Sequence, residues 1–289
     1  MQTLAAVDIG SNAIRVHIVN LLTSENDYEF KTLEYIRVPL RLGQDVFTIG
    51  RLGEEKVDKL TKLAQSLVYF FEIFNVEKYL CCATSAMRDS ANSTEVILKI
   101  KDQTGFEIQV IDGNKEAEWT DFGLRKYLGE GLWIHVDVGG GSTEINIYSD
   151  KKKIETRSFR LGAVRILMKE NVDEEWATMI EWIKSVIKPG TKIQAIGTGG
   201  NIGKIHQMSN VTSKSAVSLD KIKEITTMIA SYSTEERINI LKLNPDRADV
   251  ILPSSKIYMA VMEAAGAKQI YSPKIGLTDG MFEVLKAGL

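Results

Sequence analysis

Cysteine, histidine and proline are all scarce in this sequence of 289 residues. The two cysteines, Cys81 and Cys82, are adjacent, and neighbouring residues of a strand point to opposite faces of a sheet, so they are poor disulfide candidates and fit a reducing compartment. The three histidines are His17, His135 and His206, and none lies near another at the spacing of metal ligands. A His-rich zinc site and a Ser-His-Asp triad are therefore poorly supported.

An excess of charge of one sign is also missing, since 36 Lys and Arg against 38 Asp and Glu leave a net charge of −2. This balance argues against a global basic field, so we expect no nucleic-acid partner. No apolar run reaches about 18 residues, and no basic segment precedes the first apolar stretch, so we expect neither a membrane span nor a signal peptide. The expected location is the cytoplasm.

What the sequence does contain is a repeated pattern of strand, glycine turn and strand. Residues 4–9 and 14–21 form the first copy, and residues 132–138 and 143–148 form the second around a Gly-Gly-Gly-Ser turn. The copies align Asp8 with Asp137, an offset of 137 − 8 = 129 residues that is close to half the chain. Such a duplication predicts two related α/β domains.

The remaining periodicity predicts an alternation of helices and strands. Helices are expected over residues 54–74, 92–104, 114–128, 162–169, 173–187, 218–232, 234–241 and 278–287. Strands are expected over residues 76–83, 106–111, 153–161, 192–196 and 269–272. Residues 246–265 are expected to be mostly helical, with a break or kink at Pro253. Because no low-complexity linker is present, we expect a hinge near residues 112–118.

Three glycine turns follow apolar strands and are candidates for binding phosphate. Glycine lets the backbone approach a ligand closely, and successive N–H groups then converge on an anion. A simple hairpin turn explains any one of them, but three turns, two with an Asp at the same place, favour phosphate. They match neither a P-loop nor a dinucleotide fingerprint. The candidate contacts are Gly10, Ser11, Asn12, Gly139, Gly140, Gly141, Ser142, Thr143, Gly199 and Gly200.

Several charged residues lie near these turns. Asp8 and Asp137 end apolar strands, where each either stabilises the turn or, beside phosphate-binding amides, takes part in a Mg²⁺ site that Glu144 could also reach. Arg88 follows a buried strand and is either a solvated surface residue or a guanidinium that binds phosphate. On spacing alone, Glu116 in the first turn of a helix is interpreted as compensating the helix dipole.

Taken in order, these motifs resemble the exopolyphosphatase / guanosine pentaphosphate phosphatase family, in its short class, which is similar in fold to sugar kinases, actin and heat-shock chaperone ATPases. The resemblance covers nearly the whole chain. The stretches that carry it are Val7-Asp8-Ile9-Gly10-Ser11-Asn12 with Ile14-Arg15, Arg41-Leu42-Gly43, Ala83-Thr84-Ser85-Ala86-Met87-Arg88-Asp89, Glu116-Ala117, Asp137-Val138-Gly139-Gly140-Gly141-Ser142-Thr143-Glu144, Leu161-Gly162-Ala163-Val164-Arg165, Gly197-Thr198-Gly199-Gly200 and Arg247-Ala248-Asp249-Val250-Ile251.

The resemblance implies two actin-like (ribonuclease H-like) α/β domains with an interdomain cleft. The first domain would span residues 1–117, with residues 275–289 packing back on it, and the second would span residues 118–274. The implied reaction is the hydrolysis of a terminal phosphoanhydride bond.

The resemblance also implies roles for individual residues. Glu116 would activate the attacking water, which replaces the dipole interpretation, and Arg88 would contact phosphate. Asp137 and Glu144 match positions associated with a divalent metal, Mg²⁺ or Mn²⁺. Asp8 and Arg15 join the glycine turns as substrate contacts.

The expected substrate is inorganic polyphosphate. The alternatives are guanosine pentaphosphate or a nucleoside triphosphate as substrate, and a non-catalytic sensor of polyphosphate or nucleotide. Departures from the family pattern support the sensor, among them Lys115, which stands where an acidic neighbour of the catalytic Glu is common. A sugar or acid kinase is disfavoured because nothing marks a pocket for a second substrate. Homodimerisation is common in such folds, and a second copy of the chain is a candidate partner.

Overall fold

The structure is a computed structural model that describes residues 2–25, 27–168, 171–212 and 215–288. The chain divides into two compact units, unit 1 with Met1–Gly123 and Leu277–Leu289, and unit 2 with Leu124–Gly276. The sequence-based boundary after residue 117 lies 123 − 117 = 6 residues before this division. Both units combine a sheet with packed helices, which confirms the predicted α/β class.

Unit 1 is built on a five-stranded sheet of order β3-β2-β1-β4-β5. β1 pairs with β2 and β2 with β3 in antiparallel fashion, whereas β1, β4 and β5 run parallel. The strands are β1 (Gln2–Ile9), β2 (Ile14–Thr23), β3 (Tyr28–Val38), β4 (Lys78–Ala83) and β5 (Gln109–Val110). The helices are α1 (Leu42–Ile49), α2 (Glu54–Ile73), α3 (Ser85–Asp89), α4 (Ser93–Thr104), α5 (Gly113–Leu124) and α13 (Leu277–Ala287).

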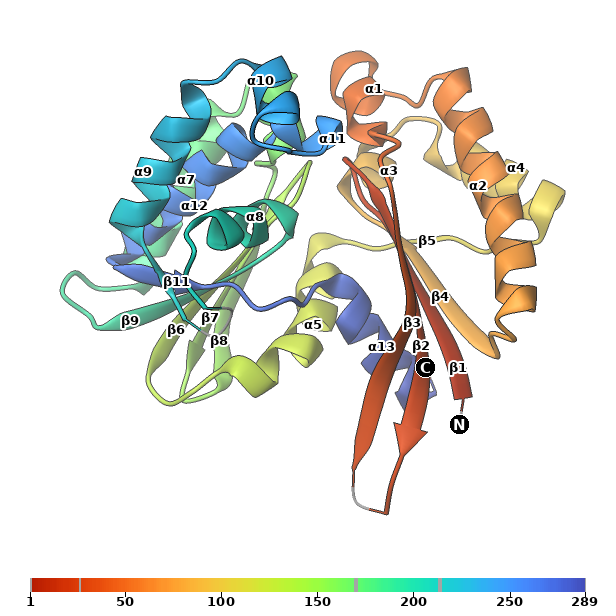
Figure 1. Cartoon of the computed structure of the whole chain (residues 1–289), viewed down its shortest axis with the longest axis horizontal. Helices are drawn as coiled ribbons and strands as arrows, with labels where there is room; N and C mark the ends of the chain where they lie inside the picture. Colours follow the sequence, from red (N-terminus) through yellow and green to blue (C-terminus); the bar gives the residue numbers. More distant parts are fainter. Residues whose placement is uncertain (1, 26, 169–170, 213–214, 289) are drawn as a thin grey trace. The chain divides into compact units, whose positions relative to one another are not determined.

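Helices cover both faces of this sheet (Figure 1), and β1 accordingly contains an unbroken apolar run at residues 4–7 before Asp8. Val7 packs on one face in a core that includes Leu60 and Leu67 of α2. Leu4 packs on the opposite face in a core that includes Met281 and Phe282 of α13. The last helix of the chain therefore completes the unit that the first strand begins.

Unit 2 repeats this architecture with a six-stranded sheet of order β10-β11-β9-β6-β7-β8. β6, β7 and β8 are antiparallel neighbours, and β6, β9 and β11 run parallel. The strands are β6 (Leu132–Val138), β7 (Thr143–Ser149), β8 (Lys152–Phe159), β9 (Ile193–Thr198), β10 (Val217–Ser218) and β11 (Gln269–Tyr271). The helical segments are η1 (Arg125–Tyr127), α6 (Ala163–Leu167), α7 (Asp173–Val186), α8 (Gly200–Met208), α9 (Leu219–Ala230), α10 (Thr234–Asn239), α11 (Pro245–Ala248) and α12 (Ile251–Ala265).

The predicted duplication is confirmed down to the register of the hairpins. Asp8 of β1 lies opposite Arg15 of β2, and Asp137 of β6 lies opposite Glu144 of β7. Both pairs are separated by seven residues, since 15 − 8 = 7 and 144 − 137 = 7. The aligned aspartates therefore hold equivalent places in the two units.

Some expected elements differ in the structure. The expected strand 106–111 is reduced to β5, and the expected helix 114–128 ends at Leu124 and continues as η1. Pro253 lies in the first turn of α12, where a missing N–H costs nothing, and the break falls before this helix instead. The expected helix 162–169 is observed as α6, and Lys169 lies outside the described residues.

Candidate functional site

In unit 1, the hairpin of β1 and β2 presents an ion pair beside the first glycine turn. Asp8 is 4% exposed, and Arg15 Nη1 donates a hydrogen bond of 2.6 Å to its Oδ2. Burying a carboxylate is costly unless it is paired. Asp8 is therefore neutralised by its cross-strand partner.

The turn Gly10–Asn12 is fixed by its neighbours. The hydroxyls of Ser11 and Ser85 share a hydrogen bond of 2.8 Å. The carbonyl of Ser11 accepts a hydrogen bond from Gly43 N at 2.8 Å, and that of Asn12 accepts one from Arg41 N at 3.0 Å. Because its carbonyls and its serine hydroxyl are used in this way, the turn is a rigid part of unit 1.

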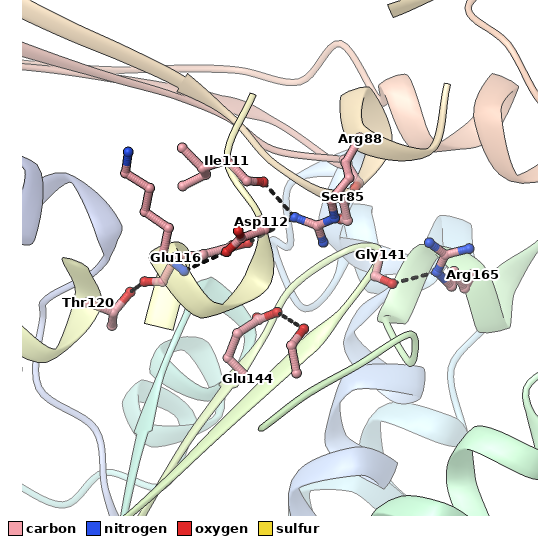
Figure 2. A network of polar contacts seen from close by, with 12 residues as sticks. Ser85, Arg88, Ile111, Asp112, Glu116, Thr120, Gly141, Glu144 and Arg165 are labelled. Atoms are coloured by element: carbon pink, nitrogen blue, oxygen red, sulfur yellow. Dashed lines mark hydrogen bonds and ion pairs between the residues drawn. The ribbon is translucent and has the colours of Figure 1, made fainter. Parts of the chain in front are cut away.

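Arg88 and Glu116, the two predicted catalytic residues, lie together in unit 1 (Figure 2). Arg88 Nη1 donates to the carbonyl of Ile111 at 2.8 Å and lies 3.8 Å from Glu116 Oε2. Glu116 lies in the first turn of α5, and Thr120 donates its hydroxyl to the Glu116 carbonyl. The side chain of Glu116 is 17% exposed and that of Arg88 is 27% exposed, so both are sheltered and still reach the surface.

The end of β4 lies near two carboxylates of the candidate site, Asp8 and Glu116. Burial raises the pKa of the Cys82 thiol well above its ordinary value, and the negative charges of Asp8 and Glu116 raise it further. Cys81 is also fully buried, with a raised pKa. The cysteines are thus protonated packing residues, and the surroundings of Cys82 place Asp8 and Glu116 about the same strand end.

Lys115, which departs from the family pattern beside Glu116, contacts residues of its own helix and the residue that precedes it. Its backbone N–H donates to Asp112 Oδ1 at 2.8 Å, and its Nζ lies 5.1 Å from the centre of the Trp119 ring. A cation over an aromatic face is attracted to it. The ammonium group is therefore held toward the following turn of α5.

In unit 2, the loop Gly139–Gly141 is bound tightly to the start of α6. Val164 N donates to the carbonyl of Gly140 at 2.7 Å, and a Cβ at Gly162 would clash with that same carbonyl. Arg165, 2% exposed, donates its Nε to the carbonyl of Gly141 at 2.5 Å (Figure 2). Sequence reasoning gave Arg165 no role, because a buried arginine under a glycine loop leaves no local signal.

Asp137 and Glu144 lie opposite each other across β6 and β7. Glu144 is 3% exposed, and Ser158 Oγ donates to its Oε1 at 2.8 Å (Figure 2). Thr143 is fully buried and donates its hydroxyl to the Leu161 carbonyl at 2.5 Å, whereas Ser142 is buried at the end of the loop. Like charges directly opposite in a sheet destabilise it, so this pair is suited to a cation.

The third glycine turn lies against Asp137. Gly199 has φ +107°, and a Cβ there would lie 3.2 Å from Asp137 Oδ1. A Cβ at Gly200 would lie 2.9 Å from Arg247 Nη2. The structure thus brings Asp137, Glu144 and two glycine turns together in unit 2, with Arg247 as a neighbour to which the motif analysis assigned no role.

A metal at this place would have few protein ligands. The described residues hold no group of three or more His, Cys, Asp or Glu that could bind a metal ion. Mg²⁺ commonly takes one or two carboxylates and completes its octahedral shell with water and substrate phosphate oxygens. Asp137 and Glu144 fit that requirement.

The described residues also include no helix that is both long and apolar enough to cross a bilayer.

Comparison with known proteins identifies the family. Residues 21–285 match the profile of the Ppx/GppA phosphatase family. The chain is 22% identical over 300 residues to exopolyphosphatase 1 of Mycobacterium tuberculosis, covering 96% of this chain and 86% of that protein. It is 24% identical over 291 residues to the guanosine-5'-triphosphate,3'-diphosphate pyrophosphatase of Photobacterium profundum, covering 96% of this chain and 58% of that protein.

Solved structures share the fold. An exopolyphosphatase from Cytophaga hutchinsonii has a TM-score of 0.85 at 21% identity, covering 100% of this chain and 99% of the other. The PPX-GPPA enzyme of Aquifex aeolicus has a TM-score of 0.77 at 24% identity, covering 97% and 98%. By the match of its sequence over residues 21–285 and by its fold, this chain belongs to the Ppx/GppA phosphatase family.

Proposed function

We propose that this chain hydrolyses the terminal phosphoanhydride bond of inorganic polyphosphate. Family membership supports the reaction class, and the similarity to the mycobacterial exopolyphosphatase over most of both chains supports the substrate. The observation that carries the proposal is the pair of Arg88 and Glu116, whose Nη1 and Oε2 atoms lie 3.8 Å apart. This pair places a proton acceptor, Glu116, beside a guanidinium that can bind phosphate, and both side chains are largely buried.

In the proposed reaction, Glu116 accepts a proton from the attacking water as the water oxygen bonds to the terminal phosphorus. The bond from that phosphorus to the bridging oxygen breaks, and its electron pair stays on the shortened chain. The products are orthophosphate and a polyphosphate one unit shorter. Arg88 contacts the oxygens of the transferred group, where a guanidinium stabilises the charge of the transition state.

The glycine turns supply backbone donors for the phosphate groups. The loop Gly139–Gly141 is held by Val164 N and by the Arg165 guanidinium, and the turn at Ser11 is held by Ser85 and Gly43. Donors fixed before the substrate binds need little reorganisation during the reaction. These contacts support phosphate binding by the residues that the sequence predicted.

Asp137 and Glu144 would hold Mg²⁺, or Mn²⁺, because two carboxylates face each other there with a serine hydroxyl on one of them. When bound, the ion would supply Lewis-acid stabilisation of phosphate oxygens. Asp8 contributes differently, since its ion pair with Arg15 fixes the guanidinium beside the first glycine turn.

Guanosine pentaphosphate is the second candidate substrate. Its support is the similarity to the Photobacterium protein, which matches 96% of this chain. Both substrates end in a phosphoanhydride-linked phosphate, so the same Glu116 chemistry serves either one.

The test measures released phosphate from polyphosphates of several lengths, guanosine pentaphosphate and nucleoside triphosphates, each with Mg²⁺ and with Mn²⁺. We expect polyphosphate to be preferred and Glu116→Gln to lose about 10²- to 10⁴-fold in kcat. Glu118→Gln is the matched control, because Glu118 is an exposed carboxylate on the same helix. Tight polyphosphate binding without phosphate release would contradict hydrolysis and favour a sensor, and near-full activity of Glu116→Gln would remove Glu116 from its role.

A further inference from the structure

In unit 2, side chains from four neighbouring strands form two successive rows. Both rows lie on the face of the sheet opposite the main core of the unit. The first row contains the proposed cation ligands and follows the order β9, β6, β7 and β8: Thr198, Asp137, Glu144 and Ser158. The second row lies one step further from the loops: Ile196, His135, Asn146 and Thr156. We call them the acidic row and the support row.

His135 is the centre of the support row and is fully buried. Asn146 Nδ2 lies 3.0 Å from His135 Nδ1, and an amide nitrogen can only donate, so Nδ1 accepts. The ring proton is then on Nε2, which lies 2.9 Å from Thr198 Oγ1 and donates to it. At the other end, Thr156 donates its hydroxyl to Asn146 Oδ1 at 2.6 Å. A chain of hydrogen bonds therefore crosses all four strands.

The chain of hydrogen bonds ends at the third glycine turn. Thr198 directly precedes Gly199, and its carbonyl accepts a hydrogen bond from the Tyr258 hydroxyl, which in turn accepts one from Val138 N at 3.2 Å. The position of a Cβ at Gly199 lies 3.2 Å from Asp137 Oδ1. The side chain and carbonyl of Thr198 are thus both held, and the turn beside Asp137 is fixed with them.

The row at the same place in unit 1 consists of Leu80, Ala6, His17 and Tyr35, and it has an alanine where the support row has His135. The residue two before Asp8 is Ala6, which lies between Leu80 and His17 in the sheet. The architecture therefore does not need a polar side chain at this position to fold. The support row occurs in the unit whose first row carries two carboxylates.

We propose that His135 is a positioning residue, which ties Thr198 to Asn146 and so fixes the third glycine turn relative to Asp137 and Glu144. The proposal rests on the proposed function, because it takes these carboxylates as cation ligands. Groups that orient metal ligands from outside typically contribute 10- to 100-fold to metal affinity or activity.

The experiment measures Mn²⁺ binding to the full chain by electron paramagnetic resonance, without substrate, together with thermal unfolding. His135→Leu keeps a side chain of apolar bulk but removes both hydrogen bonds, and we expect Mn²⁺ affinity to fall about 10- to 100-fold. His135→Gln can donate to Thr198 again and should recover much of the affinity. Ile134→Ala is the matched control, since Ile134 is the adjacent residue of β6 on the opposite, core-facing side.

We expect Ile134→Ala to lower the melting temperature while Mn²⁺ affinity stays within about twofold of the wild type. If His135→Leu fails to fold, Thr198→Val provides a second test. It removes the hydroxyl at one end of the hydrogen-bond chain with little change of side-chain shape and should weaken Mn²⁺ binding. Unchanged binding in these variants, an equal loss in Ile134→Ala, or no Mn²⁺ binding by the wild type would overturn the proposal. Mn²⁺ binding that depends on His135 in a protein inactive on every phosphate substrate would instead leave it standing and refute the hydrolytic function.

Discussion

Asp137 lies directly opposite Glu144 in the β6–β7 ladder, so two carboxylates share one face of the sheet. The equivalent pair in unit 1 is Asp8 and Arg15, whose charges cancel at 2.6 Å. One duplicated hairpin therefore carries an ion pair, and the other carries two acids. We therefore place the proposed cation in unit 2.

We predict that Glu144→Gln relieves the repulsion and removes the cation site together. Without metal, its melting temperature should equal or exceed that of the wild type, because like charges directly opposite in a sheet are destabilising. Adding Mg²⁺ should raise the melting temperature of the wild type but not that of the variant. Calorimetry with and without Mg²⁺ measures both effects, with Glu155→Gln, an exposed site on β8, as the control.

A second prediction concerns Lys115. Because its ammonium group lies over the Trp119 ring, we expect Lys115→Met to change kcat by less than about threefold and to reduce stability by about 0.5–1 kcal/mol. Steady-state kinetics and urea unfolding measure the two quantities. A tenfold or larger fall in kcat would show that the lysine takes part in the reaction.

The third prediction concerns pH and His17. Burial lowers the pKa of His17 from 6.5 to about 4, and its ring packs edge-on to Tyr35 and Phe282. Between these values the unfolded chain binds a proton that the folded chain excludes. The resulting stabilisation is complete above about pH 6.5 and is lost as the pH falls toward 4.

Urea unfolding at pH 7 and pH 4.5 tests this sign. The wild type should lose roughly 2 kcal/mol more than His17→Gln between the two pH values, because the variant has no imidazole to protonate. Carboxylates titrate in both proteins, so the comparison isolates His17. Equal losses would show that the ring is protonated as readily in the folded chain as in the unfolded chain.

The fourth prediction concerns the contact between α13 and α5. A Cβ at Gly280 would overlap the carbonyl oxygen of Trp119, which is backbone and cannot move aside cheaply. Gly280→Ala should therefore lower the free energy of unfolding by about 1–3 kcal/mol. Gly203→Ala, with nothing within 4 Å of the new methyl group, should be neutral or slightly stabilising in the same assay.

Local sequence patterns predicted much of this fold, because most helices and buried strands carry clear periodicity. β3 was not predicted, since it is an edge strand whose alternation is interrupted by an irregularity in register opposite Ile18 and Val19. α1, α3 and α8 were missed because they are short and begin at turns. Tertiary packing, which single-sequence periodicity does not contain, forms these elements.

The sequence identified some residues of the candidate site but not others. Aligning Asp8 with Asp137 located the two acids, and the register confirmed that alignment. Glu116 could be separated from an ordinary first-turn glutamate only by family resemblance. His135 stood alone in the sequence, because its partner Thr198 is 198 − 135 = 63 residues away on a strand whose pairing no local pattern specifies.

The return of α13 to unit 1 has a consequence for synthesis of the chain on the ribosome. Leu4 and its neighbours on that face of the first sheet receive part of their cover from Met281 and Phe282, which are translated only after all of unit 2. All the residues of unit 2 therefore emerge between the two parts of unit 1. β1 is made long before α13, and an early stop in translation leaves β1 with an uncovered apolar side.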